Sequence, residues 1–227
     1  MRLFFYIVLL NTHANPEHYM IKAILYDLDN TIFPVPAIGD ELFGPVFNLI
    51  AATGQHTDSM EAIKHAIMRT PFRIVAQRYG FSAKLIQQGI DLQETLEYAK
   101  PIAPFDDYIE TRTIPGERFL VTTGFSKMQY SKIKHLGIEA DFKEVHVVNP
   151  TVSSKKEVFA GILERYGYLP HEVLVVGDDP ESEIAAAKAL RIPAVLYDKN
   201  DTFSADEADY KISHFKDLKQ IVLNNRP

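Results

Sequence analysis

The sequence predicts an α/β protein whose core is a parallel sheet and which carries an all-helical insertion. Residues 21–27, "IKAILYD", form a short and nearly continuous apolar run, which is typical of a strand buried on both faces. In residues 33–103, apolar side chains recur three and four positions apart, the helical period, and no strand pattern interrupts them. From Phe119 onward, strand patterns alternate with helical patterns, which indicates βαβ units and therefore parallel strands.

The ends of the helical patterns in the insertion carry the residues that usually begin and end helices. "TDS" at 57–59 supplies residues that cap helix N-termini, and Gly80 is typical of a helix C-terminus. We therefore expect a helical cap at 33–103, inserted between the two parts of an α/β catalytic core at 20–32 and 104–227. Within the cap, helical patterns cover 39–54, 59–80 and 82–100.

The part of the chain after Phe119 alternates regularly between the two kinds of pattern. Gly137 and Gly167 follow two of the helical patterns, at the position where a residue in the left-handed conformation commonly ends a helix. In chain order, we expect strands at 118–124, 144–150, 172–179, 193–197 and 208–212, and helices at 126–138, 154–167, 181–190 and 214–225.

The composition excludes several classes of function. The chain has 227 residues, of which 46% are hydrophobic and 24% are charged, ordinary values for a soluble globular protein. A net charge of -6 gives no basic field that would attract a nucleic acid polymer or a membrane surface, although a local site can still bind a small anion. The absence of cysteine excludes disulfides and thiolate metal sites and fits a reducing compartment. We therefore expect a cytoplasmic protein, while its oligomeric state stays unknown.

Residues 1–19 permit three interpretations. The apolar run at 3–10 has about the length of a signal-peptide core, but it is too short to span a bilayer. The charged region before it is weak, and "THA" after it is a marginal cleavage site. Met20 could instead be the natural start, because "MIKAILYDLDNT" opens directly on the first strand. An extension or start-site artefact, an ordered extra segment and an export signal therefore all stay open.

Polar residues follow four of the predicted strands, at the point where each strand ends. In open parallel sheets, ligands bind beyond the carboxyl ends of the strands, so these residues should lie along one edge. The first strand ends on Asp27, and Asp29 follows two residues later, which places both carboxylates on one side of the chain. The second strand ends on Thr122 and Thr123. The third leads through "NPTVSS" to Lys155 and Lys156, and the fourth ends in "GDDPESE" at 177–183.

This set of side chains suits phosphoryl transfer. A carboxylate can attack phosphorus to form an aspartyl-phosphate, which divides one difficult displacement into two easier steps. A second acid nearby can protonate the leaving alkoxide and then activate water. Crowded carboxylates favour Mg²⁺, a hard cation that prefers oxygen ligands. Hydroxyl and lysine donors can hold the phosphoryl oxygens as negative charge builds up.

In sequence order, these four motifs resemble those of the haloacid dehalogenase-like hydrolase superfamily. "DLDNT" is similar to the first motif of that family, DxDx[TV], and "LVTTG" to the second. "SKKEVFAGILERYG" lies where the lysine of the third motif begins a helix, and "VLVVGDDPESEIAAAKAL" resembles the fourth motif, GDxxxxD or GDD. The resemblance runs from about Ile21 to Tyr197 and implies a Rossmann-like core with a helical C1 cap. One DxDxT is a modest signal, whereas four motifs in order are a strong one.

The resemblance implies a role for each residue that matches a motif. Asp27 would be the nucleophile, and Asp29 the general acid and base. Thr122 would bind the phosphoryl group, and Lys155, which fits the family spacing better than its neighbour Lys156, would pair with the nucleophile and the phosphate. Mg²⁺ would be held by Asp27, by the backbone carbonyl of Asp29 and by Asp178.

Three further residues near the motifs have open roles. Glu183 stands where the fourth motif usually has aspartate, and its extra methylene could shift the contact that it makes. Asp179 could take over that role. Thr123 is equally consistent with a turn or capping residue and with a phosphate ligand.

Two arginines in the cap are candidates for substrate recognition. Arg69 and Arg73 are four residues apart within one helical pattern, so we expect them to share a helix face. Such a pair could bind an anionic end of the substrate. The alternative is that both are solvated residues of a helix surface, which is the commoner case.

We predict an enzyme that hydrolyses a small phosphorylated metabolite with Mg²⁺. The resemblance extends most closely to the 5'-nucleotidase and phosphoglycolate phosphatase-like branch, and a pyrimidine nucleotide is the first substrate to consider. One alternative is a 2-haloacid dehalogenase, although its members generally lack an acid at the position of Asp29. The other is a catalytically quiet regulator that binds phosphate or metal, which only Glu183 favours.

Overall fold

The computed structural model describes residues 20–54, 56 and 58–224, so the expectations for 1–19 lie outside the described residues. Its centre is a sheet of parallel strands in the order β3-β2-β1-β4-β5-β6, which confirms the predicted α/β fold. The first strand therefore lies in the middle of the sheet, between β2 and β4. The strands are β1 Ala23–Tyr26, β2 Glu117–Thr123, β3 Glu144–Val148, β4 Val173–Gly177, β5 Ala194–Tyr197 and β6 Tyr210–Ile212.

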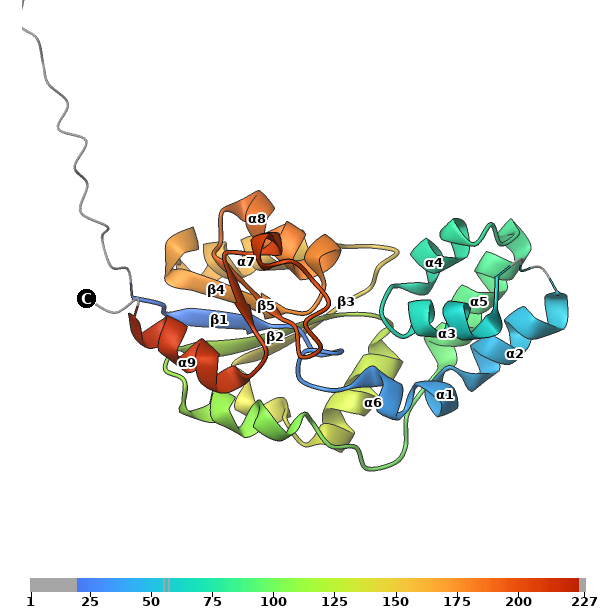
Figure 1. Cartoon of the computed structure of the whole chain (residues 1–227), viewed down its shortest axis with the longest axis horizontal. Helices are drawn as coiled ribbons and strands as arrows, with labels where there is room; N and C mark the ends of the chain where they lie inside the picture. Colours follow the sequence, from blue (N-terminus) through green and yellow to red (C-terminus); the bar gives the residue numbers. More distant parts are fainter. Residues whose placement is uncertain (1–19, 55, 57, 225–227) are drawn as a thin grey trace, which may run out of the picture.

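Helices cover both faces of the sheet, and the side chains of each strand alternate between them (Figure 1). Ala23 and Leu25 of β1 pack in one apolar cluster with the helices α7 and α8. Ile24 and Tyr26 point to the other face, where α6 and α9 pack. Burial on both faces explains the nearly continuous apolar character of the strands. The helices are α6 Ser126–Leu136, α7 Lys155–Tyr166, α8 Ala185–Leu190 and α9 Phe215–Asn224.

The helical insertion follows β1 and lies beyond the carboxyl ends of the strands (Figure 1). The two connections between the insertion and the core lie next to each other and are joined by a hydrogen bond, in which the Phe105 backbone N–H donates to the Ile32 carbonyl at 2.8 Å. The boundaries expected at 33 and 103 stay predictions. No helix of the described residues is long and apolar enough to cross a membrane. The helices are α1 Gly39–Leu42, α2 Gly44–Thr53, α3 Met60–Ile67, α4 Phe72–Arg78 and α5 Ala83–Thr95.

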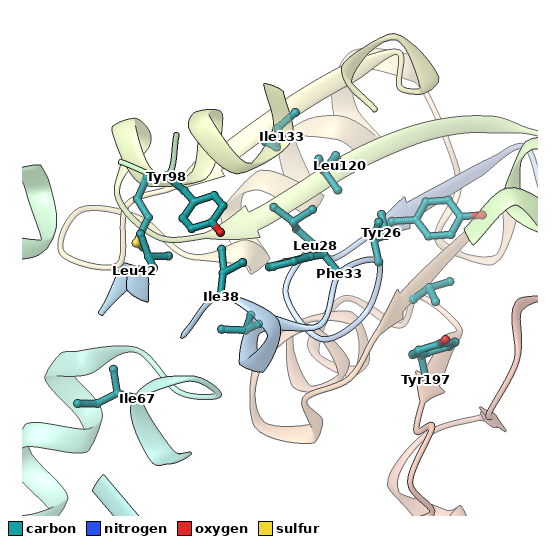
Figure 2. Close-up of a cluster of buried hydrophobic side chains, with 14 of the residues drawn as sticks. Tyr26, Leu28, Phe33, Ile38, Leu42, Ile67, Tyr98, Leu120, Ile133 and Tyr197 are labelled. Carbon is teal, nitrogen blue, oxygen red and sulfur yellow. The ribbon is translucent and has the colours of Figure 1, made fainter. Parts of the chain in front are cut away.

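One apolar cluster continues from the core into the insertion (Figure 2). Figure 2 shows Leu28 and Phe33, from the loop after β1, next to Leu120 of β2, and Leu42 of the insertion beside Tyr98. Leu28 and Phe33 are fully buried, so the loop that carries the acidic motif is anchored on both sides. Burial of such side chains contributes about 1.5–3 kcal/mol each.

The expectation that Arg69 and Arg73 share a helix face is wrong. The pattern 59–80 forms two helices, since α3 ends at Ile67 and α4 begins at Phe72. Pro71 between them has no N–H to donate, and its ring disfavours the helical conformation in the residue before it. Arg69 therefore lies in the turn and Arg73 in the first turn of α4.

We predict that Gly89→Ala lowers the free energy of unfolding by about 1–3 kcal/mol, the usual cost of overpacking. A methyl group at Gly89, inside α5, would lie 2.3 Å from two ring carbons of the buried Phe72. The measurement is urea denaturation. Gly161→Ala in α7 is the matched control, because only the half-exposed end of Arg165 lies near its methyl group. The control should gain about 0.5–1 kcal/mol from its helical position, and equal stability of both variants would contradict the prediction.

Candidate active site

Two carboxylates follow β1, at the centre of the sheet edge that faces the insertion. The Asp27 backbone N–H donates to the Val176 carbonyl of β4 at 2.9 Å, so the chain is still held in the sheet at this residue. The next side chain, Leu28, is fully buried in the apolar cluster. Asp29 then forms an isolated parallel bridge with Phe33. Anchored by these contacts, Asp27 and Asp29 both line the cavity between the core and the insertion.

Asp178 and Glu183 bring two more carboxylates to the same place. β4 is the parallel neighbour of β1, with Tyr26 opposite Val176, so the residues after each strand end side by side. Carboxylate oxygens of Asp27, Asp178 and Glu183 lie within 4.8 Å of one another, and all three residues are buried. The arrangement of strands thus gathers three acids that are far apart in the sequence.

Lys155 supplies a buried cation to these acids. It is the first residue of α7, where Ser154 and Glu157 form a capping box that fixes the helix start. Its Nζ donates to Asp27 Oδ1 at 2.8 Å and to Glu183 Oε2 at 2.6 Å. The neighbouring Lys156 is exposed. The structure therefore brings Lys155, the lysine preferred from the sequence, to the nucleophile candidate.

Burial and crowding change the charge balance of the cluster. Burial raises the pKa of Asp27 to about 7, although the positive charge of Lys155 acts to lower it. Burial also raises the pKa of Asp178, and repulsion from Glu183 and Asp27 adds to this effect. Burial alone would lower the pKa of Lys155, but the two carboxylates that it contacts hold that pKa above its ordinary value. The cluster thus has more negative charge than the lysine can balance, which favours binding of a further cation.

Glu183 is accommodated by a glycine at the end of β4. A methyl group on Gly177 would lie 2.0 Å from Glu183 Cγ, so the glutamate side chain fills the space that a larger residue would occupy. Both of its oxygens are engaged, because Oε2 accepts from Lys155 and Oε1 accepts from the Asp179 backbone N–H at 2.7 Å. The Asp179 carboxylate itself accepts from the Glu181 backbone N–H and caps the following π-helical turn, Pro180–Ile184.

Thr122 and Thr123 end β2 at the same edge, and both line the cavity. Thr122 is almost completely buried, and its Oγ1 accepts a hydrogen bond from Gln129 Nε2 at 2.5 Å. The Thr123 carbonyl accepts from the same nitrogen at 3.0 Å. Gly124 has a φ of 156°, and a methyl group there would lie 2.8 Å from Gln129 Cγ, so glycine permits this close approach.

Sequence reasoning missed two residues of α6 that contact the acidic motif. Lys132 has a side chain that is 1% exposed, and its Nζ donates to both Asp29 oxygens at 2.6 Å. Gln129 Nε2 donates to Asp29 Oδ2 at 3.0 Å. A signal was present, because Lys132 lies four residues from both Met128 and Leu136, on the apolar stripe of the helix. A lysine in such a position needs a partner in the core.

All of the candidate site residues predicted from the sequence line this cavity. Apolar side chains of the insertion, including Phe43 and Phe72, form its far wall. Arg69 Nη2 donates to Asp178 Oδ2 at 2.9 Å across the gap between insertion and core. Arg73 lines the same cavity from α4. These candidate residues are Asp27, Asp29, Arg69, Arg73, Thr122, Thr123, Lys155, Asp178, Asp179 and Glu183.

The chain is similar over most of its length to proteins that are named as phosphatases. It is 26% identical to a protein named glyceraldehyde 3-phosphate phosphatase from Methanopyrus kandleri, over 89% of this chain and 97% of that protein. It is 23% identical to a protein named ribulose-1,5-bisphosphate 5-phosphatase from Halopiger xanaduensis, over 89% of this chain and 100% of that protein.

The fold is shared with solved structures of low sequence identity. A haloacid dehalogenase-like family hydrolase from Streptococcus pneumoniae has a TM-score of 0.68 and 17% identity, over 88% of this chain and 98% of that one. The hydrolase YfnB from Bacillus subtilis, solved with bound magnesium, has a TM-score of 0.59 and 18% identity, over 89% and 99% of the two chains. Residues 24–197 also match the family model for haloacid dehalogenase-like hydrolases, a span that contains the whole cluster of acids, threonines and Lys155 described above. This chain belongs to the haloacid dehalogenase-like hydrolase family.

Proposed function

We propose that this hydrolase cleaves small phosphomonoesters, with Mg²⁺, through an aspartyl-phosphate on Asp27. The observation that carries the proposal is the pair of acids after β1, which share one cavity but have different partners. Asp27 contacts Lys155 in the buried cluster, and Asp29 contacts Lys132 and Gln129 at the side. Two carboxylates in different environments are the usual arrangement when one attacks and the other transfers protons.

Each step of the reaction has a candidate residue in the cavity. Asp27 would attack phosphorus, and the alkoxide that leaves would take its proton from Asp29. Asp29 would then accept a proton from the water that hydrolyses the aspartyl-phosphate. Lys155, beside Asp27, would stabilise the charge on the phosphoryl oxygens, and the Thr122 hydroxyl would donate to one of them.

The donor set of the cluster fits a divalent cation. Its carboxylate oxygens lie within 4.8 Å of one another, and oxygen ligands of this kind suit Mg²⁺. Because both Glu183 oxygens are engaged, Asp27 and Asp178 are the carboxylates that would hold the ion, with the Asp29 carbonyl as the third ligand that the family resemblance implies. When bound, Mg²⁺ would neutralise charge on the phosphoryl group during transfer. The magnesium in YfnB supports this choice of metal.

The names of the relatives support a small sugar phosphate as the substrate class. Glyceraldehyde 3-phosphate and ribulose 1,5-bisphosphate, which those names contain, are both short phosphorylated carbohydrates. The apolar wall of the insertion would close over the carbon skeleton and exclude water during the reaction. A pyrimidine nucleotide stays a prediction from the sequence, to be included in the same substrate screen.

We predict that Asp27→Asn abolishes phosphate release from p-nitrophenyl phosphate, while the variant unfolds at the same temperature as the wild type or slightly above it. The amide has nearly the same shape but cannot form the aspartyl-phosphate, so the loss should reach several orders of magnitude. Retention of a tenth of the wild-type rate would remove Asp27 from this role.

We predict that EDTA removes the activity, that Mg²⁺ restores it and that Ca²⁺ restores little. The larger and looser coordination shell of Ca²⁺ would misplace the phosphoryl group relative to Asp27. The measurement is phosphate release after each metal is added back to chelated enzyme. Halide release from 2-chloropropionate in EDTA would instead support the dehalogenase alternative, and no turnover of either substrate class would support the quiet regulator.

We predict that Asp29→Asn is severe for phenyl phosphate and milder for p-nitrophenyl phosphate. Loss of a general acid costs about 10²–10⁴-fold when the leaving group needs a proton, and p-nitrophenolate leaves without one. The measurement is kcat/KM for both esters, whose similar shapes keep binding comparable. An equal loss for both esters would count against the acid role.

We predict that Arg73→Ala raises KM for the best substrate of a metabolite screen more than for p-nitrophenyl phosphate. A lost charge-assisted contact would cost about 1.5–3 kcal/mol, or roughly ten- to a hundred-fold in kcat/KM. Arg73 is a cleaner test than Arg69, which also contacts Asp178. Arg78→Ala is the control, because Arg78 is exposed on the same helix and is not among the residues that line the cavity. Unchanged kinetics in both variants would show that Arg73 is a solvated surface residue.

A further inference from the structure

Lys132 is a buried cation whose position the proposed reaction does not yet explain. It lies in the middle of α6, on the buried side of the helix, which also carries Met128, Gln129 and Ile133. Its side chain is 1% exposed, and burial of an ammonium group is costly unless it is paired and hydrogen bonded. In the described part of the chain its ion-pair partner is Asp29. The favourable charge contact of Lys132 is therefore with the Asp29 carboxylate, the group to which we assign proton transfer.

The contact between Lys132 and Asp29 constrains the orientation of the carboxylate. Lys132 Nζ lies 2.6 Å from both Asp29 oxygens, so it bridges them from one side. The Asp29 side chain is 25% exposed, which leaves its other side open toward the cavity. Neither Lys132 nor Gln129 is among the residues that line the cavity. Lys132 thus holds Asp29 from behind and does not itself reach the space where a substrate would bind.

Gln129 extends the same support to the phosphoryl-binding threonine. One turn before Lys132, its Nε2 lies within hydrogen-bond distance of Asp29 Oδ2 and of Thr122 Oγ1. Because Thr122 Oγ1 accepts from this amide, its own proton is free to donate elsewhere, as binding of a phosphoryl oxygen requires. The Thr122 hydroxyl is thereby left as a donor toward the cavity, while Asp29 Oδ2 accepts from the same nitrogen.

We propose that Lys132 and Gln129 are positioning residues, through which α6 fixes the orientation in which Asp29 meets the leaving group. The inference rests on the proposed phosphomonoesterase function. Correct alignment of a proton-transfer group is worth orders of magnitude in rate, so its loss should appear in the chemical step. Neither residue touches substrate in this arrangement. The effect of Lys132 on the rate passes through Asp29, and that of Gln129 passes through Asp29 and Thr122.

The test compares Lys132→Met and Gln129→Met, alone and in the Asp29→Asn background, with phenyl phosphate and p-nitrophenyl phosphate. Lys134→Met is the matched control, because Lys134 is exposed on the same helix. We expect Lys132→Met to lose about ten-fold or more in kcat for phenyl phosphate and less than about three-fold for p-nitrophenyl phosphate. Gln129→Met, which also releases Thr122, should lose activity with both esters, but more with phenyl phosphate. In the Asp29→Asn background, Lys132→Met should change either rate by less than about two-fold, since its effect would pass through the missing carboxylate, whereas Gln129→Met should keep the loss that passes through Thr122.

The leaving-group dependence separates positioning from a structural role. A merely structural lysine would lower the melting temperature and reduce both rates equally, and that result would overturn the inference. Additive losses from Lys132→Met in the Asp29→Asn background would overturn it too. If Lys132→Met does not fold, Gln129→Met, which leaves no buried charge unpaired, decides by a larger loss with phenyl phosphate than with p-nitrophenyl phosphate, and an equal loss with both esters would overturn the inference. Phosphate release by the wild type from neither ester would overturn the proposed function itself, whereas activity without this leaving-group pattern overturns only the positioning role.

Discussion

The contact of Lys155 with Asp27 and Glu183 is the interaction on which the geometry of the site depends. It joins residues that are 128 and 28 positions apart in the sequence, from α7, the end of β1 and the turn after β4. The three side chains are 6%, 8% and 2% exposed, so none of these charges is well solvated. Removal of Lys155, the cation that the two carboxylates share, would leave buried negative charges without a partner, and a loss of this kind typically costs about 3–5 kcal/mol. The strands β1 and β4 and the start of α7 are therefore held in one relative position by the same charges that the chemistry requires.

The two acids after β1 are divided between helices on opposite faces of the sheet. Asp27 contacts Lys155 of α7, which packs on one face, and Asp29 contacts Lys132 of α6, which packs on the other. Two carboxylates only two residues apart thus each have a lysine of their own. Their surroundings differ further, because Asp27 is buried among Asp178 and Glu183, whereas Asp29 is partly open to the cavity. The sheet, with one helix layer on each face, is what makes different roles possible for neighbouring acids.

The sequence predicted those features that depend on local patterns. The alternation of strands and helices indicated parallel strands, and parallel strands place Asp27, Thr122 and Asp178 at one edge whatever the strand order. The helical period of the apolar residues continues on both sides of Pro71, so the period alone does not show that the helix breaks there. As a result Arg69 and Arg73 were expected on one helix face, whereas a turn separates them.

The features that the sequence did not predict depend on how one element is rotated against another. The contact of Lys132 with Asp29 requires the rotation of α6 about its axis and its distance from β1, which no pattern within α6 specifies. The helical period only marks Lys132 as a charged residue on a buried face. The fit of Glu183 is similar, because the glutamate side chain occupies the space that a side chain at Gly177, six residues earlier, would fill. The residue type, glutamate in place of aspartate, suggested a mismatch there, whereas the packing shows that Glu183 fits against Gly177.

The helical insertion, or cap, contacts the acidic residues of the site through polar side chains as well as contacting the core through apolar ones. Asn30, directly after Asp29, has a φ of 57° and donates from Nδ2 to the Met68 carbonyl at 3.2 Å, in the turn between α3 and α4. The next residue of that turn, Arg69, contacts Asp178. Asparagine is one of the few residues that adopt this left-handed conformation readily, so the same backbone geometry orients Asp29 and offers an amide to the cap. Movement of the turn away from the core would break both contacts and would leave Asp178 without its guanidinium partner. The position of the cap and the charge balance of the acids are therefore coupled in this fold, through two residues that are adjacent in the turn.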